Sequence, residues 1–183
     1  MKTFTATILA AALTAGAASA ATLTPIGATF DPDAVANRGS DNGRNIIGNA
    51  FDGDASTFFE IGLGSTVDFV FGQPFTGPGS VIEVTFGSAD ARPESATIFG
   101  GRNGTFTELA RVTNAQSQTP FSFAFGGTFD VLRFTDTSTP RQGQTTGGFD
   151  IAEVSVSPVP VPAAGLLLLG GLAGMGAMAR RKR

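Results

Sequence analysis

The chain has 183 residues, a formal charge of −3 at pH 7 and 17 phenylalanines, with no cysteine, histidine, tryptophan or tyrosine. These absences exclude disulfides, thiol nucleophiles, Ser-His pairs and zinc sites built from Cys or His. Residues 21–158 carry 15 carboxylates and only seven arginines, a formal charge of −8, so this region would repel the phosphates of nucleic acids.

The N-terminus predicts a secretory signal peptide over residues 1–20. Lys2 precedes an apolar run from Ile8 to Leu13, and small residues follow as far as Ala20. A charged start, a short apolar run and an A-x-A-like end are typical of a cleaved signal, and the run is too short to span a bilayer. We expect cleavage between Ala20 and Ala21. The alternative is a buried N-terminal helix.

From residue 58 onward the chain reads as short strands separated by turns. Apolar and polar residues alternate with period two at 66–71, 82–86 and 121–125, which is typical of strands with one buried face. In the second of these, Ile82, Val84 and Phe86 are expected to face the core. Further strand candidates are residues 96–99, 106–112, 129–134 and 149–156. Turn signals rich in Gly and Pro occur at residues 72–74, 77–79, 102–104 and 126–127.

About eight strands with no helices between them predict an all-β fold, an antiparallel β-sandwich or jelly roll over residues 21–158. Three local patterns lie within it. Residues 49–58 contain an Asp-Gly-Asp turn, residues 96–109 form a hairpin, and the strands at 129–134 and 149–156 end in an apolar-Ala-Glu-apolar sequence. In this order they resemble the discoidin-like, galactose-binding-like jelly roll of coagulation-factor C-type domains and related carbohydrate-binding modules. Phe58 and Phe106 stand where that family has tryptophan.

The Asp-Gly-Asp turn is the strongest candidate site. Asp52 and Asp54 flank a glycine, and Thr57 follows three residues later, so the turn presents the hard oxygen ligands that Ca²⁺ prefers. The resemblance implies a structural Ca²⁺ held by Asp52, Asp54 and Thr57 together with Glu153. The alternative is an Asx-type turn without a metal.

Arg92 and Arg141 are candidate ligand-binding residues, because they could meet an anionic or sugar ligand at the loop end of a jelly roll. The alternative is a solvated loop with scattered charges. Arg133 is expected to cover a sheet face or to pair with a neighbouring acid. No pair of carboxylates stands out for glycoside hydrolysis, so we expect no enzymatic activity.

The C-terminus carries a sequence in three parts. The segment Val159-Pro160-Val161-Pro162-Ala163 leads into an uncharged stretch that ends at residue 179, and residues 180–183 are all basic. A helix over 163–179 would be about 25 Å long, enough for a thin hydrocarbon core, with its basic end in the cytoplasm. This order resembles the PEP-CTERM sorting signal in its VPLPA-CTERM variant, with Val161 in place of leucine. The resemblance implies processing by an exosortase-type membrane protease. The alternative is a plain single-span anchor.

The sequence therefore predicts an exported, non-enzymatic surface or matrix protein of a Gram-negative bacterium. A signal peptide (1–20) takes it through the inner membrane, a tail (159–183) holds it there transiently, and the β-sandwich (21–158) is displayed at the cell surface or in the extracellular matrix. There it would bind extracellular polysaccharide. Two alternatives stay open, a purely structural envelope or matrix component without a specific ligand, and a small glycoside hydrolase.

Overall fold

The computed structural model describes residues 21–30, 43–85, 87–116, 118–139 and 147–159. The signal peptide, Arg141 and the tail from Pro160 onward lie outside these residues, so the expectations for them stay predictions. Within the described residues, no helix has the length and apolar character needed to cross a membrane. The described part is all-β, as the sequence predicts, with two short 3₁₀ turns.

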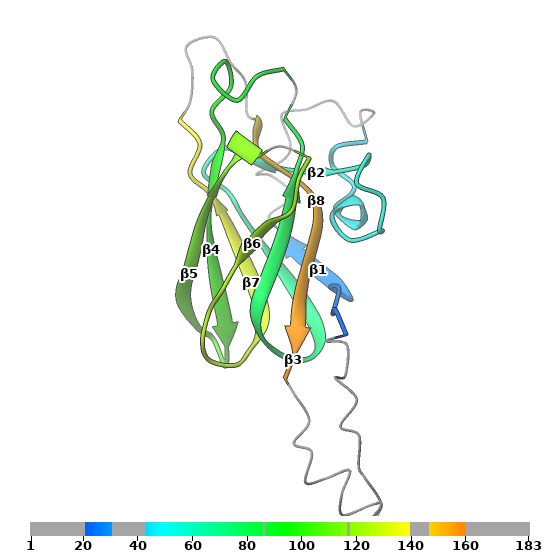
Figure 1. The fold of residues 1–183 in the computed structure, drawn as a ribbon, viewed down its shortest axis with the longest axis vertical. Coiled ribbons are helices and arrows are strands. Elements are labelled where there is room, and N and C mark those ends of the chain that lie inside the picture. Colours follow the sequence, from blue (N-terminus) through cyan, green and yellow to red (C-terminus); the bar gives the residue numbers. More distant parts are fainter. Residues whose placement is uncertain (1–20, 31–42, 86, 117, 140–146, 160–183) are drawn as a thin grey trace, which may run out of the picture.

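The strands, in chain order, are β1 (Gly27–Phe30), β2 (Phe59–Gly62), β3 (Thr66–Glu83), β4 (Ser95–Arg102), β5 (Thr105–Thr113), β6 (Phe121–Phe123), β7 (Phe129–Asp136) and β8 (Gly147–Pro158). The 3₁₀ turns are η1 (Ile47–Ala50) and η2 (Asn114–Gln116). All strand pairs described are antiparallel. Figure 1 shows that the strands follow the long axis of the molecule, with loops gathered at its two ends.

Strand β3 belongs to two layers. Its first half, from Thr66 to Val70, pairs with β1 on one side and with β7 on the other, and β7 continues the layer through β4 to β5. Its second half, from Phe75 to Glu83, pairs with β8 and β6, and β8 continues to β2. The two layers enclose the core of a β-sandwich, which agrees with the predicted fold class.

The turns predicted at residues 72–74 and 77–79 are wrong, because β3 runs through both. Their glycines and prolines instead lie where the ladder is irregular, between Val70 and Phe75 and between Thr76 and Gly79. Such positions tolerate residues that cannot donate to a ladder or that lack a side chain. Gly77 also lies so close to the backbone of Phe125 that a Cβ would stand 2.6 Å from its carbonyl oxygen. These residues therefore bend a strand rather than end it.

The predicted orientation of residues 82–86 is partly wrong. Ile82 is only half-buried, while its neighbours Val81 and Glu83 are buried. Val84 is buried as expected, and Phe86 lies outside the described residues. Two adjacent apolar residues, Val81 and Ile82, fit either register of a period-2 pattern, and the pairing with β8 selects the one that turns Val81 inward.

The core is built largely from phenylalanine. Five phenylalanines are completely buried: Phe59, Phe69, Phe75, Phe134 and Phe149. The rings of Phe69 and Phe134 meet edge to face across β3 and β7, with centroids 5.6 Å apart. This geometry sets the positive ring edge against the negative face and adds to the energy of burial.

Arg133 covers a sheet face and pairs with an acid, as predicted. Its Nε and Nη2 donate to the two carboxylate oxygens of Asp68 at 2.7 and 2.8 Å. Its guanidinium carbon also lies 3.6 Å from the centre of the Phe106 ring. The phenylalanine at the family's tryptophan position is therefore stacked on a cation, across the outer face of β7 and β5.

Substitution of Phe75 tests how far the core depends on the bend in β3, because this residue lies where β3 passes between the layers. The centroid of its ring is 4.7 Å from that of Phe71 and 6.2 Å from that of Phe129. We expect Phe75→Ala to lower the free energy of unfolding by about 3–5 kcal/mol in denaturant titrations. Phe106→Ala, at a half-exposed ring, is the control and should cost much less. Equal losses would show that the bend does not depend on this ring.

Candidate functional site

An open hollow lies at the end of the sandwich where β4 begins and where β5 and β7 end, at the top of Figure 1. Its volume is about 310 Å³. The lining residues are Ala89, Asp90, Pro93, Glu94, Ser95, Thr113, Asn114, Ala115 and Thr139. Six of these residues carry carboxyl, amide or hydroxyl groups and the other three are small and apolar, and none of the described lining residues is aromatic. A ligand here would therefore find hydrogen-bonding groups on a wall that is partly apolar.

Asn114 fixes the loop that forms one wall of the hollow. This side chain is 2% exposed. Its Oδ1 accepts a hydrogen bond from the Glu94 amide at 3.1 Å, and its Nδ2 donates to the Arg92 carbonyl at 2.5 Å. The Asn114 amide donates in turn to the Glu94 carbonyl at 3.1 Å. One buried amide therefore satisfies the backbone of residues 92–94, and the wall is held in one conformation.

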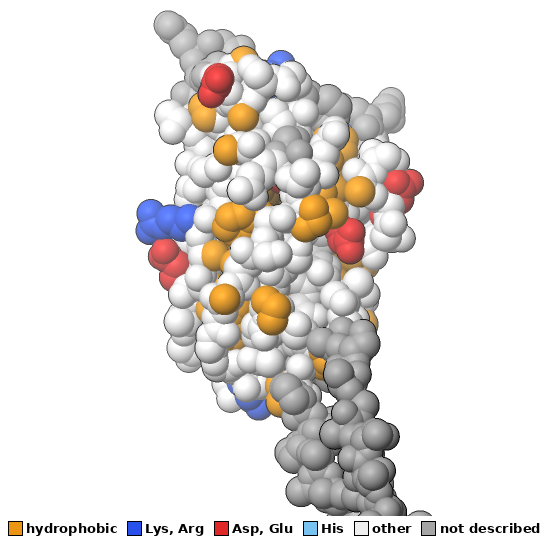
Figure 2. Space-filling model, viewed as in Figure 1, with side chains coloured by type: hydrophobic (Ala, Val, Ile, Leu, Met, Phe, Trp, Pro, Cys, Tyr) orange, Lys and Arg blue, Asp and Glu red, His pale blue; other side chains and the backbone are white. Residues whose placement is uncertain are grey.

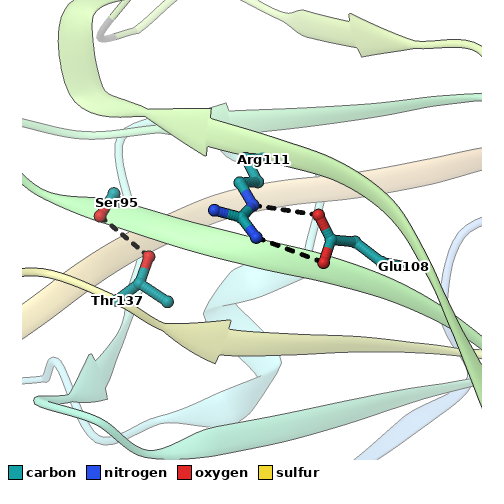
Figure 3. Close-up of polar contacts among 4 residues, drawn as sticks. All are labelled: Ser95, Glu108, Arg111 and Thr137. Carbon is teal, nitrogen blue, oxygen red and sulfur yellow. Dashed lines mark hydrogen bonds and ion pairs between the residues drawn. The ribbon is translucent and has the colours of Figure 1, made fainter.

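Hydroxyl groups tie the opposite wall to β4. The Ser95 and Thr137 hydroxyls lie 2.9 Å apart (Figure 3), and the Ser95 amide donates to Ser138 Oγ at 3.0 Å. Ser138 Oγ donates to the Asp136 carboxylate at 2.6 Å. Figure 3 also shows Arg111 paired with Glu108 on the exposed face of β5, so that arginine is engaged by its own strand. The end of β7 is thus held against the start of β4.

Of the two predicted ligand-binding arginines, the structure describes one. Arg92 is exposed and lies in the loop that walls the hollow, where its positive charge partly offsets the negative charge near Glu94. Arg141 lies outside the described residues. The structure therefore places Arg92 beside the hollow and leaves Arg141 as a prediction.

Buried carboxyl groups gather beneath this end of the sandwich. Burial raises the pKa of Glu94 to about 8, and the negative charge of Glu83 adds to the shift. Burial likewise raises the pKa of Asp150 to about 9, with the charges of Glu60 and Glu94 adding to it. Glu94 Oε2 and Asp150 Oδ1 accept no hydrogen bond from the described residues. Burial and the neighbouring negative charges therefore favour the protonated forms of both groups in the folded protein.

Asp136, at the same end of the sandwich, is a buried carboxyl group whose oxygens accept several hydrogen bonds. Besides the bond from Ser138, it accepts hydrogen bonds from the amides of Gly64 at 2.8 Å and Phe149 at 2.9 Å. Burial still raises its pKa, while these three donors oppose the rise. A Cβ at Gly148 would collide with this carboxylate, so glycine is required there.

Sequence reasoning missed the buried acids. Glu60 and Asp150 are directly opposite each other on β2 and β8, and each stands between two large apolar residues. A period-2 pattern assigns such a residue to the water-facing side of a strand. Here η1 packs against both strands, so Glu60 and Asp150 are only 2% and 4% exposed. Arg44 reaches Glu60 at 3.5 Å. Nothing in the local sequence distinguishes these carboxylates from exposed ones.

The predicted calcium loop is brought together as a compact turn. Asp52 Oδ1 accepts from the Asp54 amide at 2.8 Å, and Asp52 Oδ2 accepts from the Thr57 hydroxyl at 2.8 Å. Asp54 Oδ1 accepts from the amide and the hydroxyl of Ser56 at 2.9 and 2.6 Å, which lowers the pKa of Asp54. These are the bonds of an Asx turn, the alternative that the sequence left open.

Glu153, the fourth predicted calcium ligand, is half-buried on β8 and lies opposite Ile82 of β3. No hydrogen bond or ion pair among the described residues joins its side chain to the Asp-Gly-Asp turn. Within the same residues, no three acidic side chains converge as a metal site would require. The donor chemistry of the turn fits Ca²⁺, since every group is an oxygen, but three of its carboxylate oxygens already accept hydrogen bonds from the turn.

The fold is shared with known carbohydrate-binding modules. The CBM32 domain of AlyQ, solved with 4,5-unsaturated mannuronic acid, aligns with a TM-score of 0.54 and 20% identity, over 74% of this chain and 97% of that one. A pectin-binding carbohydrate-binding module aligns with a TM-score of 0.55 and 15% identity, over 76% and 96%. The family 32 module of NanJ from C. perfringens, solved with galactose, gives a TM-score of 0.51 and 17% identity, over 74% and 98%.

These likenesses confirm the predicted discoidin-like, galactose-binding-like fold for the described part of the chain. A truncated AlyQ with CBM32 and alginate lyase domains also aligns, and this chain covers 34% of it. The structural neighbours are binding modules, and some of them are attached to enzymes. No protein-family model and no curated protein sequence matches the chain.

The raised pKa values of the buried acids predict an unusual pH dependence of stability. Between the ordinary values of 3.8 and 4.5 and the folded values of about 9 and about 8, the folded state of Asp150 and Glu94 binds more protons than the unfolded state. Stability is therefore greatest at mildly acidic pH and falls as the pH rises through the folded pKa values. Thermal unfolding between about pH 5 and about pH 9 measures this fall.

The double variant Asp150→Asn, Glu94→Gln should unfold at a higher midpoint than the wild type at alkaline pH and should show a flatter pH profile, because neither side chain can ionise. Glu108→Gln, on the exposed face of β5, is the matched control and should leave the profile unchanged. A wild-type midpoint that rises steadily from acidic to alkaline pH would contradict the assignment.

Proposed function

We propose that the protein is an exported, non-enzymatic surface or matrix component that binds extracellular polysaccharide. The binding site would be the hollow where β4 begins and where β5 and β7 end, which we call the loop-end hollow. The observation that carries the proposal is the hollow of about 310 Å³, walled by amide, hydroxyl and carboxyl groups that a buried Asn114 holds in place. The fold supports it, because structural neighbours were solved with 4,5-unsaturated mannuronic acid and with galactose, and another binds pectin.

The polarity of the hollow suits a polyhydroxylated ligand. Sugar hydroxyls both donate and accept, and the wall offers both kinds of group from Ser95, Thr113 and Thr139. Arg92 at its edge would attract a uronate or sulfate group on a polysaccharide. The raised pKa of Glu94 favours its protonated form, which would donate a hydrogen bond to such a group instead of repelling it. Because none of the described lining residues is aromatic, a single sugar would be held weakly, and tight retention would need repeated contacts along the polymer.

Display at the surface is supported by the positions of the chain ends. Leu23 and Val156 exchange two backbone hydrogen bonds, of 2.7 and 2.9 Å, so the described domain begins and ends side by side. Strand β8 starts at the loop end and finishes at the opposite one, where Val159 leads to the tail (Figure 1). We infer that the signal peptide and the PEP-CTERM-like tail, processed by an exosortase-type protease, place the domain outside the inner membrane. The hollow would then face away from the membrane.

Retention in native gels tests the binding proposal. The protein is run through gels containing alginate, pectin, galactan or dextran, and the loss of mobility gives an apparent affinity. We expect retention by at least one anionic polysaccharide, weakened up to about fivefold by Arg92→Ala, since an exposed ion pair contributes about 0.2–1 kcal/mol.

The matched control is Arg102→Ala, which removes an exposed arginine at the opposite end of β4. Equal effects of the two substitutions would show only a loss of net charge and would contradict the assignment of the hollow. Mobility unchanged by every polysaccharide would favour the purely structural alternative. Release of reducing ends, abolished by Glu94→Gln, would favour a hydrolase.

We propose in addition that the Asp-Gly-Asp turn holds a structural Ca²⁺ through Asp52, Asp54 and Thr57, with Glu153 as the further ligand. The ion would tie the turn to β8. Calcium at 100 times its dissociation constant should stabilise the fold by about 2.7 kcal/mol, seen as a rise in the thermal midpoint that excess chelator reverses. Asp54→Asn should abolish the rise, whereas Glu108→Gln should not. A thermal midpoint that is the same with calcium and with chelator would contradict the calcium proposal. The turn would then be stabilised by its own hydrogen bonds alone.

A further inference from the structure

Hydroxyl side chains form a row across the outer face of the layer that contains β8, β3 and β6. Ser80 of β3 lies directly opposite Ser155 of β8 on one side and Ser122 of β6 on the other. Each of these serines alternates with a residue that packs in the core, such as Val81 or Val154. The alternation turns the hydroxyls outward together. Thr22 extends the row beyond β8, because its neighbour Leu23 pairs with Val156.

A second hollow, with a volume of about 190 Å³, lies on this row. Its lining residues are Thr22, Pro78, Gly79, Ser80, Ser122, Ser155, Val156 and Ser157. The hollow exists because every side chain across four neighbouring segments is small. None of the lining residues is charged or aromatic. On the face shown in Figure 2, most of the surface is uncharged. We call this feature the serine hollow.

The hydroxyls of the serine hollow are available to a ligand. Among the described residues, no side-chain hydrogen bond is made by Thr22 or by any of the four serines, Ser80, Ser122, Ser155 and Ser157. Ser155 is the least accessible of them, at 9% exposed. Five hydroxyl groups, each both donor and acceptor, therefore converge on one depression without being used by the fold.

We propose that the serine hollow is a second binding site, specific for an uncharged sugar unit of a neutral polysaccharide. An anionic ligand would find no cation among the described lining residues, and the apolar part of the wall, which includes Pro78 and Val156, is interrupted by hydroxyl groups. A neutral sugar matches the wall, because its ring of hydroxyls exchanges hydrogen bonds with donors and acceptors alike. The volume lies below the range of about 300–1,000 Å³ typical of drug-sized ligands, so the site takes one sugar unit of a chain.

This second site differs from the loop-end hollow in chemistry and in place. The loop-end hollow has an arginine and carboxyl groups around it, whereas the serine hollow has only hydroxyl and small apolar groups. They lie on different parts of the sandwich, one at the loop end and one on a sheet face. Two weak sites on one rigid domain would bind a polymer more tightly than either site alone. The proposal for the serine hollow does not depend on the proposal for the loop-end hollow, because no described residue lines both hollows.

The test compares two double variants of the full chain that have equal side-chain bulk. Ser80→Val, Ser155→Val removes both central hydroxyls, while Ser80→Thr, Ser155→Thr keeps them and adds the same methyl volume. Both substitutions favour strands, so the fold is retained. In native gels containing dextran or galactan, we expect the wild type and the threonine variant to be retained, and the valine variant to lose at least about tenfold in apparent affinity, as expected for two lost hydrogen bonds.

Arg92→Ala separates this proposal from the loop-end site, because it should leave retention by the neutral polysaccharides unchanged. Equal retention of the valine and threonine variants would overturn the proposal, as would wild-type mobility that neither neutral polysaccharide alters.

Discussion

Strand β3 is the constraint on which the rest of the structure depends, because it is hydrogen-bonded into both layers of the sandwich. Its first half is flanked by β1 and β7 and its second half by β8 and β6, so the two layers cannot separate without breaking one strand. The bend between the halves occurs where glycine and proline interrupt the ladder. Phe71 and Phe75 fill the inside of that bend. Packing of the bend thereby couples the layers.

The same arrangement explains why phenylalanine alone supplies the aromatic core. A sandwich without disulfides must obtain its stability from apolar burial, and large rings bury the most area for each position on a strand. The side chains of tyrosine and tryptophan would each bring a polar atom that needs a partner. Buried carboxyl groups lie instead at one end of the sandwich. There Asp136 accepts hydrogen bonds from three donors, and burial raises the pKa of Asp150 and favours its neutral form.

The two hollows show how one fold offers different chemistries at different surfaces. At the loop end, walls come from connecting segments, which can carry charged and amide groups because they are free of the strand alternation. On the sheet face, alternation restricts the outward positions to one set of residues, and serine at each of them leaves a shallow depression lined with hydroxyls. The chain ends leave the domain beside each other, opposite the loop end, so a tail that enters a membrane would leave both surfaces accessible.

The fold class was largely predictable from the sequence. Alternation at 66–71, 121–125 and 129–134 is local, since it depends only on the order of apolar and polar residues along a strand. The first and third of these segments are strands of the antiparallel sandwich, and the second is a strand as far as Phe123. The Asp-Gly-Asp turn was predictable for the same reason, because its hydrogen bonds join residues at most five positions apart. Arg92 was found as a candidate because an exposed arginine in a polar loop is visible without knowledge of the fold.

Other features were decided by tertiary contacts. The path of β3 through two proline segments depends on which strands lie beside it, and the inward turn of Val81 rather than Ile82 depends on pairing with β8. The burial of Glu60 and Asp150 depends on η1 covering their strands, and the convergence of Ser80, Ser122 and Ser155 depends on the register of three strands far apart in sequence. The sequence by itself determined the alternation along each strand and local turns such as the Asp-Gly-Asp turn, because these depend on residues that are neighbours along the chain. Only the tertiary structure decided which acids are buried and which hydroxyls meet, because burial and convergence require segments that the chain brings together from a distance.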